Sequence, residues 1–181
     1  QGRVDAVGQR HRVCCSPVTM VVRAADPVKD AVPCAAIYAP YVTDHWASFE
    51  LEAPDAAEMG RRIGAYAQSH GWLVAERDGQ VLGYAYGCPH RERAAYASSC
   101  DTAIYLDPAA TGQGIGRALY TELLAGLRQR GFHAAFAGVV IPNPASIALH
   151  EAMGFTPVGI YRQVGWKHDE WRDVGWWQLL L

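Results

Sequence analysis

The sequence has 181 residues, of which 50% are apolar and 19% charged, and its formal net charge is −2. A chain of this length and composition can bury a core as one soluble α/β domain. Its 16 basic and 18 acidic side chains form neither a basic stripe typical of nucleic-acid binding nor a long acidic run. No apolar run approaches the roughly 20 residues that span a membrane. We therefore predict no nucleic-acid partner and no membrane partner.

The first nineteen residues contain three arginines but no apolar stretch, which argues against a secretory signal. Met20 stands just before the first apolar segment, so we expect residues 1–19 to be a loose extension and residues 20–181 to be one domain. The five cysteines are odd in number and lack metal-ligand spacing. Free thiols in a reducing cytoplasm fit this pattern, and we predict a cytoplasmic protein without a bound metal. The cysteines are Cys14, Cys15, Cys34, Cys88 and Cys100.

The first half of the chain predicts one strand, two helices and a hairpin. A short β-rich run is followed by Asp26, which we expect to cap a helix with Pro27 at its first position. Apolar spacing then predicts a helix shortened or bent by two prolines, and after it an amphipathic helix. Asp78-Gly79 is a strong signal for a tight turn between two strands. The predicted ranges are 20–24, 31–41, 55–69, 72–76 and 80–86.

The second half alternates strands and helices. The clearest helix carries four leucines on one face and ends at Gly131, a typical residue just beyond a helix. The predicted strands are 100–106, 133–140, 156–164 and 174–180, and the predicted helices are 114–130 and 144–153. This order predicts a mixed sheet covered by helices in a single α/β domain.

The segment from Thr111 to Leu119, Thr-Gly-Gln-Gly-Ile-Gly-Arg-Ala-Leu, follows a strand and opens the leucine-bearing helix. Alternating glycines let the backbone approach a ligand closely, and the free N–H groups of a helix N-terminus bind phosphate. A tight loop before a good helix start would look similar. The segment lacks the Lys-Ser/Thr of a Walker loop, and it lies too late in the chain for a dinucleotide fold.

This segment resembles the acyl-CoA loop of the GCN5-related N-acetyltransferase superfamily, in which Gln/Arg-x-x-Gly-x-Gly/Ala is the pattern. Gly114 and Gly116 match the glycines, whereas Thr111 stands at the Gln/Arg position. The resemblance implies cofactor contacts to acetyl-CoA from the loop residues. These are Thr111, Gly112, Gln113, Gly114, Ile115, Gly116 and Arg117.

A narrower resemblance links most of the chain to the phosphinothricin N-acetyltransferase family. Its motifs are Asn143-Pro144-Ala145-Ser146-Ile147-Ala148-Leu149-His150-Glu151-Ala152-Met153-Gly154-Phe155, the tail from Gly165 to Gln178, Ser48-Phe49-Glu50 and Arg93-Ala94-Ala95-Tyr96. The resemblance implies a twisted, mostly antiparallel central sheet flanked by helices, acetyl-CoA as co-substrate, and a homodimer.

The family places a glutamate at the start of the central strand, and Asp101 occupies that position here. Because an α-amine is mostly protonated near neutral pH, a carboxylate must take its proton before transfer, directly or through water. The resemblance therefore implies that Asp101 is the base. An acid that only caps backbone groups at the strand edge is the alternative.

The same strand would supply backbone groups of Ile104, Tyr105 and Leu106 to the pantetheine arm, as in the superfamily. Asn143, Ser146 and His150 have the i, i+3, i+7 spacing of one helix face. Such a stripe is commonly just a solvated face. The resemblance instead implies that Asn143 and Ser146 bind the cofactor and that His150 protonates the leaving thiolate, unless it is a buried imidazole bonded to backbone.

For the acceptor, the resemblance implies a pocket lined by Phe49, Arg93 and Tyr96, with Arg91 at a weaker basic position. Arginine forks suit carboxylate or phosphinate groups. An exposed loop is the alternative for these arginines. Four tryptophans near the C-terminus either pack the last hairpin or contribute to a dimer interface.

Together these features predict an acyltransferase that moves an acetyl group from acetyl-CoA directly to the amino group of a small amino-acid-like acceptor of the phosphinothricin or methionine sulfoximine/sulfone type. A detoxifying role follows from such acceptors. Two alternatives stay open: a different amine such as an antibiotic, and an acyl-CoA-binding regulatory module with little turnover.

Overall fold

The computed structural model describes residues 19–181. The expectation for residues 1–19 and the thiols of Cys14 and Cys15 therefore fall outside it, apart from residue 19 itself. The strands are β1 (Val21–Ala24), β2 (Trp72–Arg77), β3 (Gln80–Pro89), β4 (Ser99–Leu106), β5 (Ala134–Ile141), β6 (Thr156–Lys167) and β7 (Glu170–Leu180). The helices are α1 (Ala31–Thr43), α2 (Ala56–Tyr66), α3 (Ile115–Gln129) and α4 (Pro144–Ala152), with short 3-10 turns at Ala94–Tyr96 and Pro108–Ala110. The predicted order of elements is confirmed.

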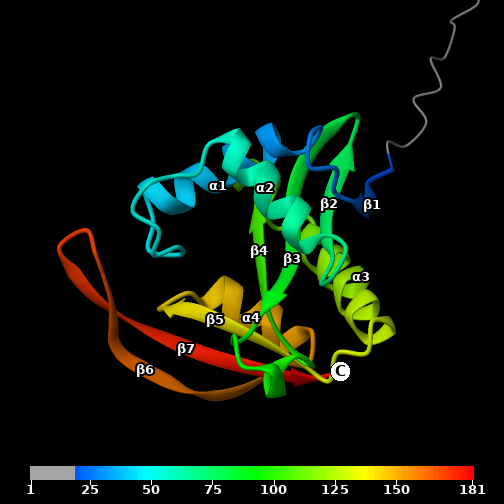
Figure 1. The fold of residues 1–181 in the computed structure, drawn as a ribbon. Helices are drawn as coiled ribbons and strands as arrows, with labels where there is room; N and C mark the ends of the chain where they lie inside the picture. The colour runs from blue at the N-terminus through cyan, green and yellow to red at the C-terminus, as the bar shows by residue number, and fades with distance from the viewer. Residues whose placement is uncertain (1–18) are drawn as a thin grey trace, which may run out of the picture.

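The seven strands form one sheet in the order β1-β2-β3-β4-β5-β7-β6 (Figure 1). Neighbouring strands run antiparallel except for β4 and β5, which are parallel. The β2–β3 turn has Asp78 at φ 53° and Gly79 at φ 78°, which is the positive-φ pair that the sequence predicts for a tight hairpin.

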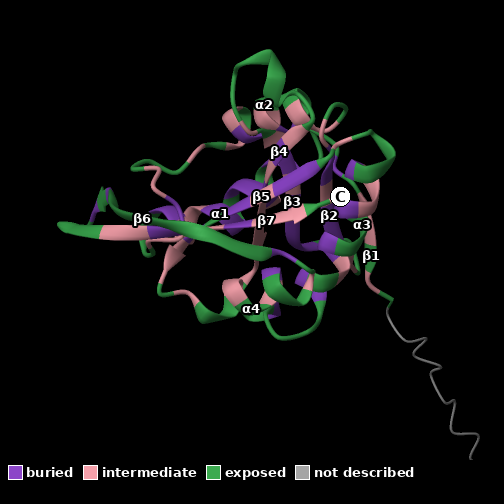
Figure 2. Cartoon of the chain, turned by 90° about the horizontal axis from the view of Figure 1, so that it is seen from below, coloured by how far each residue is buried: buried purple, intermediate pink, exposed green. Residues whose placement is uncertain are grey.

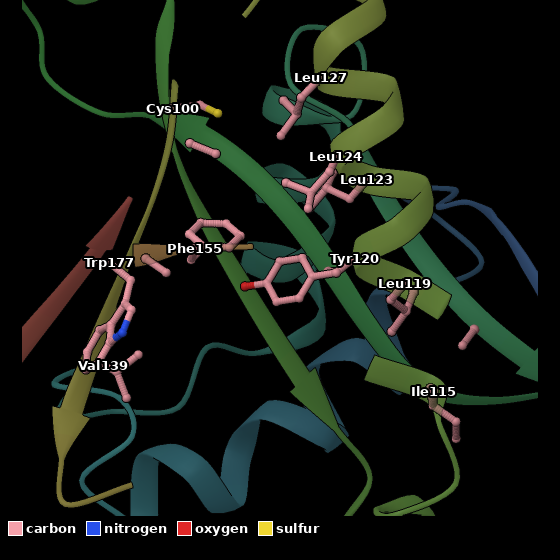
Figure 3. Close-up of a cluster of buried hydrophobic side chains, with 14 of the residues drawn as sticks. Cys100, Ile115, Leu119, Tyr120, Leu123, Leu124, Leu127, Val139, Phe155 and Trp177 are labelled. Carbon is pink, nitrogen blue, oxygen red and sulfur yellow. The ribbon is translucent and has the colours of Figure 1, made fainter. Parts of the chain in front are cut away.

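Helices α3 and α4 cover one face of the sheet. The leucines of α3 point toward the strands, where they meet Cys100, Phe155 and Trp177 in one buried cluster (Figure 3). Helices α1 and α2 cover the opposite face over β2, β3 and β4, around a second cluster that includes Trp72 and Tyr84. Figure 2 shows how much of β6 stays exposed compared with the buried central strands.

The parallel pair β4–β5 is hydrogen-bonded only near its beginning. Its register covers three pairs, Ser99 with Ala134, Cys100 with Ala135, and Asp101 with Phe136. Beyond Asp101 the two strands separate, although β4 continues to Leu106 and β5 to Ile141. The central sheet thus opens into a wedge, and Asp101 lies at its vertex.

The structure corrects two details of the sequence prediction. Asp26 does not cap a helix: its carboxylate accepts from the N–H groups of Val28 and Lys29 and forms a turn. Helix α1 begins later, after Asp30, a buried carboxylate held by Arg23 at 2.7 and 2.8 Å. The last hairpin is also longer than predicted, because β6 and β7 pair almost to their turn at His168 and Asp169.

Candidate active site

A cleft of about 590 Å³ occupies the wedge between β4 and β5. Its walls combine the separated strands, the glycine-rich turn, the first turns of α3 and one side of α4. The lining residues include Thr102, Ala103, Ile104, Tyr105, Leu106, Thr111, Gly112, Gly114, Ile115, Gly116, Arg117, Tyr120, Gly138, Val139, Val140, Asn143, Ser146 and His150. The structure therefore brings nearly all of the predicted cofactor contacts together around one cavity.

The glycine-rich turn leaves backbone exposed at the cleft mouth. Gly112 and Gly114 have φ values of 74° and 78°, in the left-handed region that favours glycine. A Cβ at either position would meet nothing within 4 Å, so open space lies over this backbone. Gly114 is the N-cap of α3 and offers no side-chain acceptor, so the first N–H groups of the helix face the cleft mouth without a capping side chain. This end of α3 favours an anion.

Three side chains of this turn behave differently. Arg117 is exposed and lines the cleft, where it adds a positive charge. The Thr111 hydroxyl donates to the Pro108 carbonyl at 3.1 Å, so this hydroxyl already has an acceptor. Gln113 does not line the cleft: its Oε1 accepts from Arg77 at 2.9 Å. Of the predicted loop contacts, only Gln113 lies outside the lining.

On β4, the backbone edge that faces β5 is free of strand pairing beyond Asp101. Ile104, Tyr105 and Leu106 lie on this open stretch and line the cleft. The opposite edge is fully paired with β3, up to Leu106 with Gly83. An extended ligand rich in amides could pair with the free edge as an added strand.

The polar stripe of α4 does face the cleft. Asn143 caps the helix, since its Oδ1 accepts from the Ser146 N–H at 3.1 Å. His150 lies one turn further along and is buried. Its Nδ1 donates to the Ser146 carbonyl at 2.7 Å, so the alternative of an imidazole bonded to backbone describes its observed state.

The other nitrogen of His150 is also engaged. Nε2 accepts from the hydroxyl of Tyr120 at 2.8 Å. Burial lowers the pKa of His150 and raises that of Tyr120, which favours the neutral form of both groups. Sequence reasoning missed Tyr120, because a tyrosine in a leucine-rich helix looks like a core residue; Figure 3 shows its hydroxyl extending away from α3.

Asp101 and His90 form a pair beside the vertex of the wedge. His90 Nδ1 donates to Asp101 Oδ1 at 2.5 Å, and both side chains are largely buried. Burial raises the pKa of Asp101, whereas the hydrogen bond from His90 opposes that rise. Strand alternation places Asp101 on the sheet face opposite Cys100, away from α3. Sequence reasoning missed His90 because the register that brings it to Asp101 is not visible in the sequence.

None of the predicted acceptor residues lines the main cleft. Arg91, Arg93 and Tyr96 line a separate hollow of about 530 Å³ together with His90. Both arginines are exposed, which agrees with the alternative that this segment is an exposed loop. His90 belongs to this hollow and bonds Asp101 at the vertex, although neither residue lines the main cleft.

Phe49 lies on the other side, in the loop after α1. A Cβ on Gly165 of β6 would overlap the Phe49 ring, so the ring rests directly on this glycine. The loop is also held by buried Lys167, whose Nζ donates to the carbonyls of His45 at 3.0 Å and Ser48 at 2.6 Å. Ala47 of this loop lines the main cleft. The β6–β7 hairpin thus fixes the loop that carries Phe49.

A sheet split by a parallel pair, with a phosphate-favouring helix start at the split, defines a class of protein. The chain belongs to the acetyltransferase (GNAT) family, whose model matches residues 38–155. This range contains the glycine-rich turn, Asp101 and His150.

Within the family, the chain is similar to phosphinothricin N-acetyltransferases. It is 39% identical over 163 residues to the enzyme of Alcaligenes faecalis. The aligned region covers 88% of this chain and 80% of that enzyme. The fold matches a phosphinothricin acetyltransferase from Sinorhizobium meliloti in complex with acetyl-CoA, with a TM-score of 0.85, 35% identity, and coverage of 90% and 89% of the two chains. The structure of YncA from Salmonella typhimurium with its cofactor acetyl-CoA also gives a TM-score of 0.85, at 33% identity and 90% and 94% coverage.

Among residues 19–181, none of the helices is both long enough and apolar enough to cross a membrane.

Proposed function

We propose that the protein transfers an acetyl group from acetyl-CoA directly to the amino group of a small amino-acid-like acceptor. The observation that carries this proposal is the wedge itself. It runs from a phosphate-favouring helix start along the free edge of β4 to the vertex, where the last β4–β5 pair contains Asp101, a half-buried carboxylate just outside the cleft lining. Relatives named for phosphinothricin and for methionine sulfoximine and sulfone indicate the acceptor class.

The residues present fit acetyl-CoA. The uncapped start of α3 and Arg117 would hold the diphosphate, while the free edge of β4 and Asn143 would hold the amide-rich pantetheine arm. When bound, acetyl-CoA supplies an acetyl group activated as a thioester. The Ser146 hydroxyl lines the cleft and accepts a long contact of 3.4 Å from His150 Nδ1, so its own O–H can donate to the cofactor arm.

Asp101 is the base of the proposed reaction. The acceptor enters as an ammonium ion, and the Asp101 carboxylate takes one proton from it, directly or through water. The amine lone pair then forms the C–N bond as the C–S bond breaks. The nitrogen gives its second proton to water, which balances the proton that the leaving sulfur takes up, and Asp101 returns its own proton to solvent. The shorter arm of aspartate, relative to the family glutamate, favours transfer through water.

The leaving sulfur takes its proton at the Tyr120–His150 pair, which regains a proton from water before the next turnover. The Nδ1–H of His150 is held by the Ser146 carbonyl, so the proton that can be redirected is the Tyr120 hydroxyl proton now shared with Nε2. We infer that His150 acts together with Tyr120, which refines the sequence expectation that His150 protonates the thiolate alone.

Direct transfer is supported by the state of the nearest thiols. Cys100 is buried against α3, and burial raises its pKa to about 12. Cys88 faces Asp101, and burial raises its pKa to about 11. Since the thiolate is the nucleophile, neither cysteine is suited to carry the acetyl group near neutral pH.

The acceptor site is proposed to lie at the vertex, between the Phe49 loop and the arginine loop. Arg91, Arg93 and Tyr96 would bind the acid groups of the acceptor, because exposed guanidinium groups pair with carboxylate or phosphinate. We propose in addition that the protein detoxifies such acceptors and that it does so in the cytoplasm.

The proposed homodimer uses the last hairpin. Trp177 packs in the core, as the sequence predicts, but Trp166 and Trp171 are 51% and 54% exposed. The edge strand β6 also exposes Val158, Ile160, Tyr161 and Val164. An apolar strip on an edge strand is a typical interaction surface.

Thiol release measured with acetyl-CoA tests the proposed function. The acceptor panel is phosphinothricin, methionine sulfoximine, methionine sulfone, unmodified amino acids and a polyamine-type amine. We expect release with at least one amino-acid-like acceptor and a mass increase of one acetyl group on its nitrogen. Binding of acetyl-CoA without release from any acceptor would instead favour the regulatory module.

A further inference from the structure

His90 lies where it can control the proposed base, although its sequence position in an arginine-rich loop gives no hint of this. Strand β3 pairs Cys88 with Asp101, and His90 follows Cys88 by two residues, so it reaches the same sheet face. Its Nδ1 is 2.5 Å from Asp101 Oδ1. An ionised carboxylate has only acceptor atoms, so Nδ1 must be the donor.

The imidazole is fixed by its surroundings. It stacks on Phe136 of β5 with ring centroids 4.3 Å apart, and the edges of Tyr96 and Trp176 close around it. The Arg91 side chain donates to the His90 carbonyl at 2.7 Å, which holds the backbone at this point. A ring held on several sides presents its N–H to Asp101 in one orientation.

We propose that His90 is a positioning residue for the reaction: its N–H donates to the Asp101 carboxylate at the vertex of the wedge and keeps it ionised. This inference rests on the proposed role of Asp101 as base. His90 itself forms no bond to the acetyl group or the amine.

The charged and titratable groups around the pair decide what its loss would do. Burial disfavours the ionised form of Asp101, whereas His90 and Arg91 favour it. The neighbouring thiol of Cys88 is uncharged. Tyr96 is the titratable group that packs on the His90 ring from the 3-10 turn. Removing the His90 N–H therefore raises the pKa of Asp101, because burial is then opposed by Arg91 alone.

The test compares His90→Phe with His90→Asn. Phenylalanine keeps a ring on Phe136 but has no donor, whereas the Asn amide places an N–H where Nδ1 stood. The ratio of variant to wild-type kcat/KM is measured against pH with one acceptor, so that ionisation of the substrate cancels. For His90→Phe we expect the ratio to be near one on the alkaline side and to fall about tenfold on the acid side, for a shift of about one pH unit. His90→Asn should stay close to wild type.

Two further measurements keep a structural effect apart from the proposed one. In an Asp101→Asn background, His90→Phe should cause no additional loss, since His90 acts through Asp101. The ¹³C shift of the Asp101 carboxyl, assigned with Asp101→Asn, should titrate at higher pH in His90→Phe than in wild type.

A pH-independent ratio, or an unchanged Asp101 titration, would overturn the role of His90. If the wild type acetylates no amine at all, the proposed function fails, and the carboxyl titration still decides whether His90 controls Asp101.

Discussion

The two ends of the wedge are built in different ways. At the cofactor end, a glycine-rich turn, one helix start and a free strand edge lie within a few residues of each other in the sequence or follow strictly from strand pairing. At the acceptor end, Asp101, His90 and Phe49 come from distant segments, held by long-range contacts such as Lys167 with the carbonyls near residue 48. We therefore expect binding of the cofactor to depend mainly on the backbone and selection of the acceptor to depend on side chains.

The largest effect should come from the acceptor end. Asp101→Asn keeps the shape but removes the proton acceptor, so kcat/KM should fall roughly 100-fold to 10,000-fold while the Kd for acetyl-CoA stays within about twofold. A thiol-release assay gives kcat/KM, and calorimetry gives the Kd for acetyl-CoA. Asp78→Asn, at the exposed turn between β2 and β3, is the matched control and should be neutral. Full activity in Asp101→Asn would remove Asp101 from the mechanism.

A smaller loss is expected where the two ends meet. Tyr120→Phe removes the proton shared with His150, so kcat should fall about tenfold with little change in the KM for acetyl-CoA. The unpaired Nε2 should also lower the free energy of unfolding by about 1–2 kcal/mol, measured by urea denaturation. An unchanged kcat in a correctly folded variant would place the proton source elsewhere.

The cofactor end can be weakened selectively through charge. Arg117→Gln should raise the KM for acetyl-CoA about fivefold, an effect limited by solvent exposure, and leave the KM for the acceptor unchanged. Arg128→Gln changes the same charge in the last turn of α3 and serves as the control. Equal effects of the two substitutions would show that only net charge matters, and that Arg117 makes no contact with phosphate.

The smallest change sharpens the acceptor end. Gly165→Ala places a methyl group against the Phe49 ring, so the ring must move. We expect a threefold or smaller rise in the KM for the acceptor and a loss of about 1–3 kcal/mol in unfolding free energy. Gly159→Ala on the same strand has open space around the new methyl group and should change neither. A shifted KM for acetyl-CoA instead would mean that Phe49 serves the cofactor.

The same contrast explains what the sequence could predict. The order of elements, the hairpin at Asp78-Gly79 and the glycine-rich turn before α3 depend on local patterns, and the structure confirms them. The roles of Asp101 and His150 were predicted through resemblance and stay predictions. The predicted range 31–41 matches the start of α1 at Ala31, but Asp26 was wrongly expected to cap it. The residue before the helix is Asp30, which is buried against Arg23 of β1, and the sequence does not show this contact.

The partners of those two residues could not be found in the sequence. His90 meets Asp101 only because β3 and β4 pair in one register, and Tyr120 meets His150 only because α3 and α4 pack on the same sheet face. Neither contact leaves a periodic pattern.

The central claim is that the wedge, opening beyond Asp101 and lined by the start of α3, binds acetyl-CoA. Isothermal titration of the purified protein with acetyl-CoA and with free coenzyme A tests it most directly. We expect both compounds to give heat that saturates at one site per chain, and we expect Arg117→Gln to bind acetyl-CoA with a larger Kd. No heat with either compound, from protein shown to be folded, would contradict it.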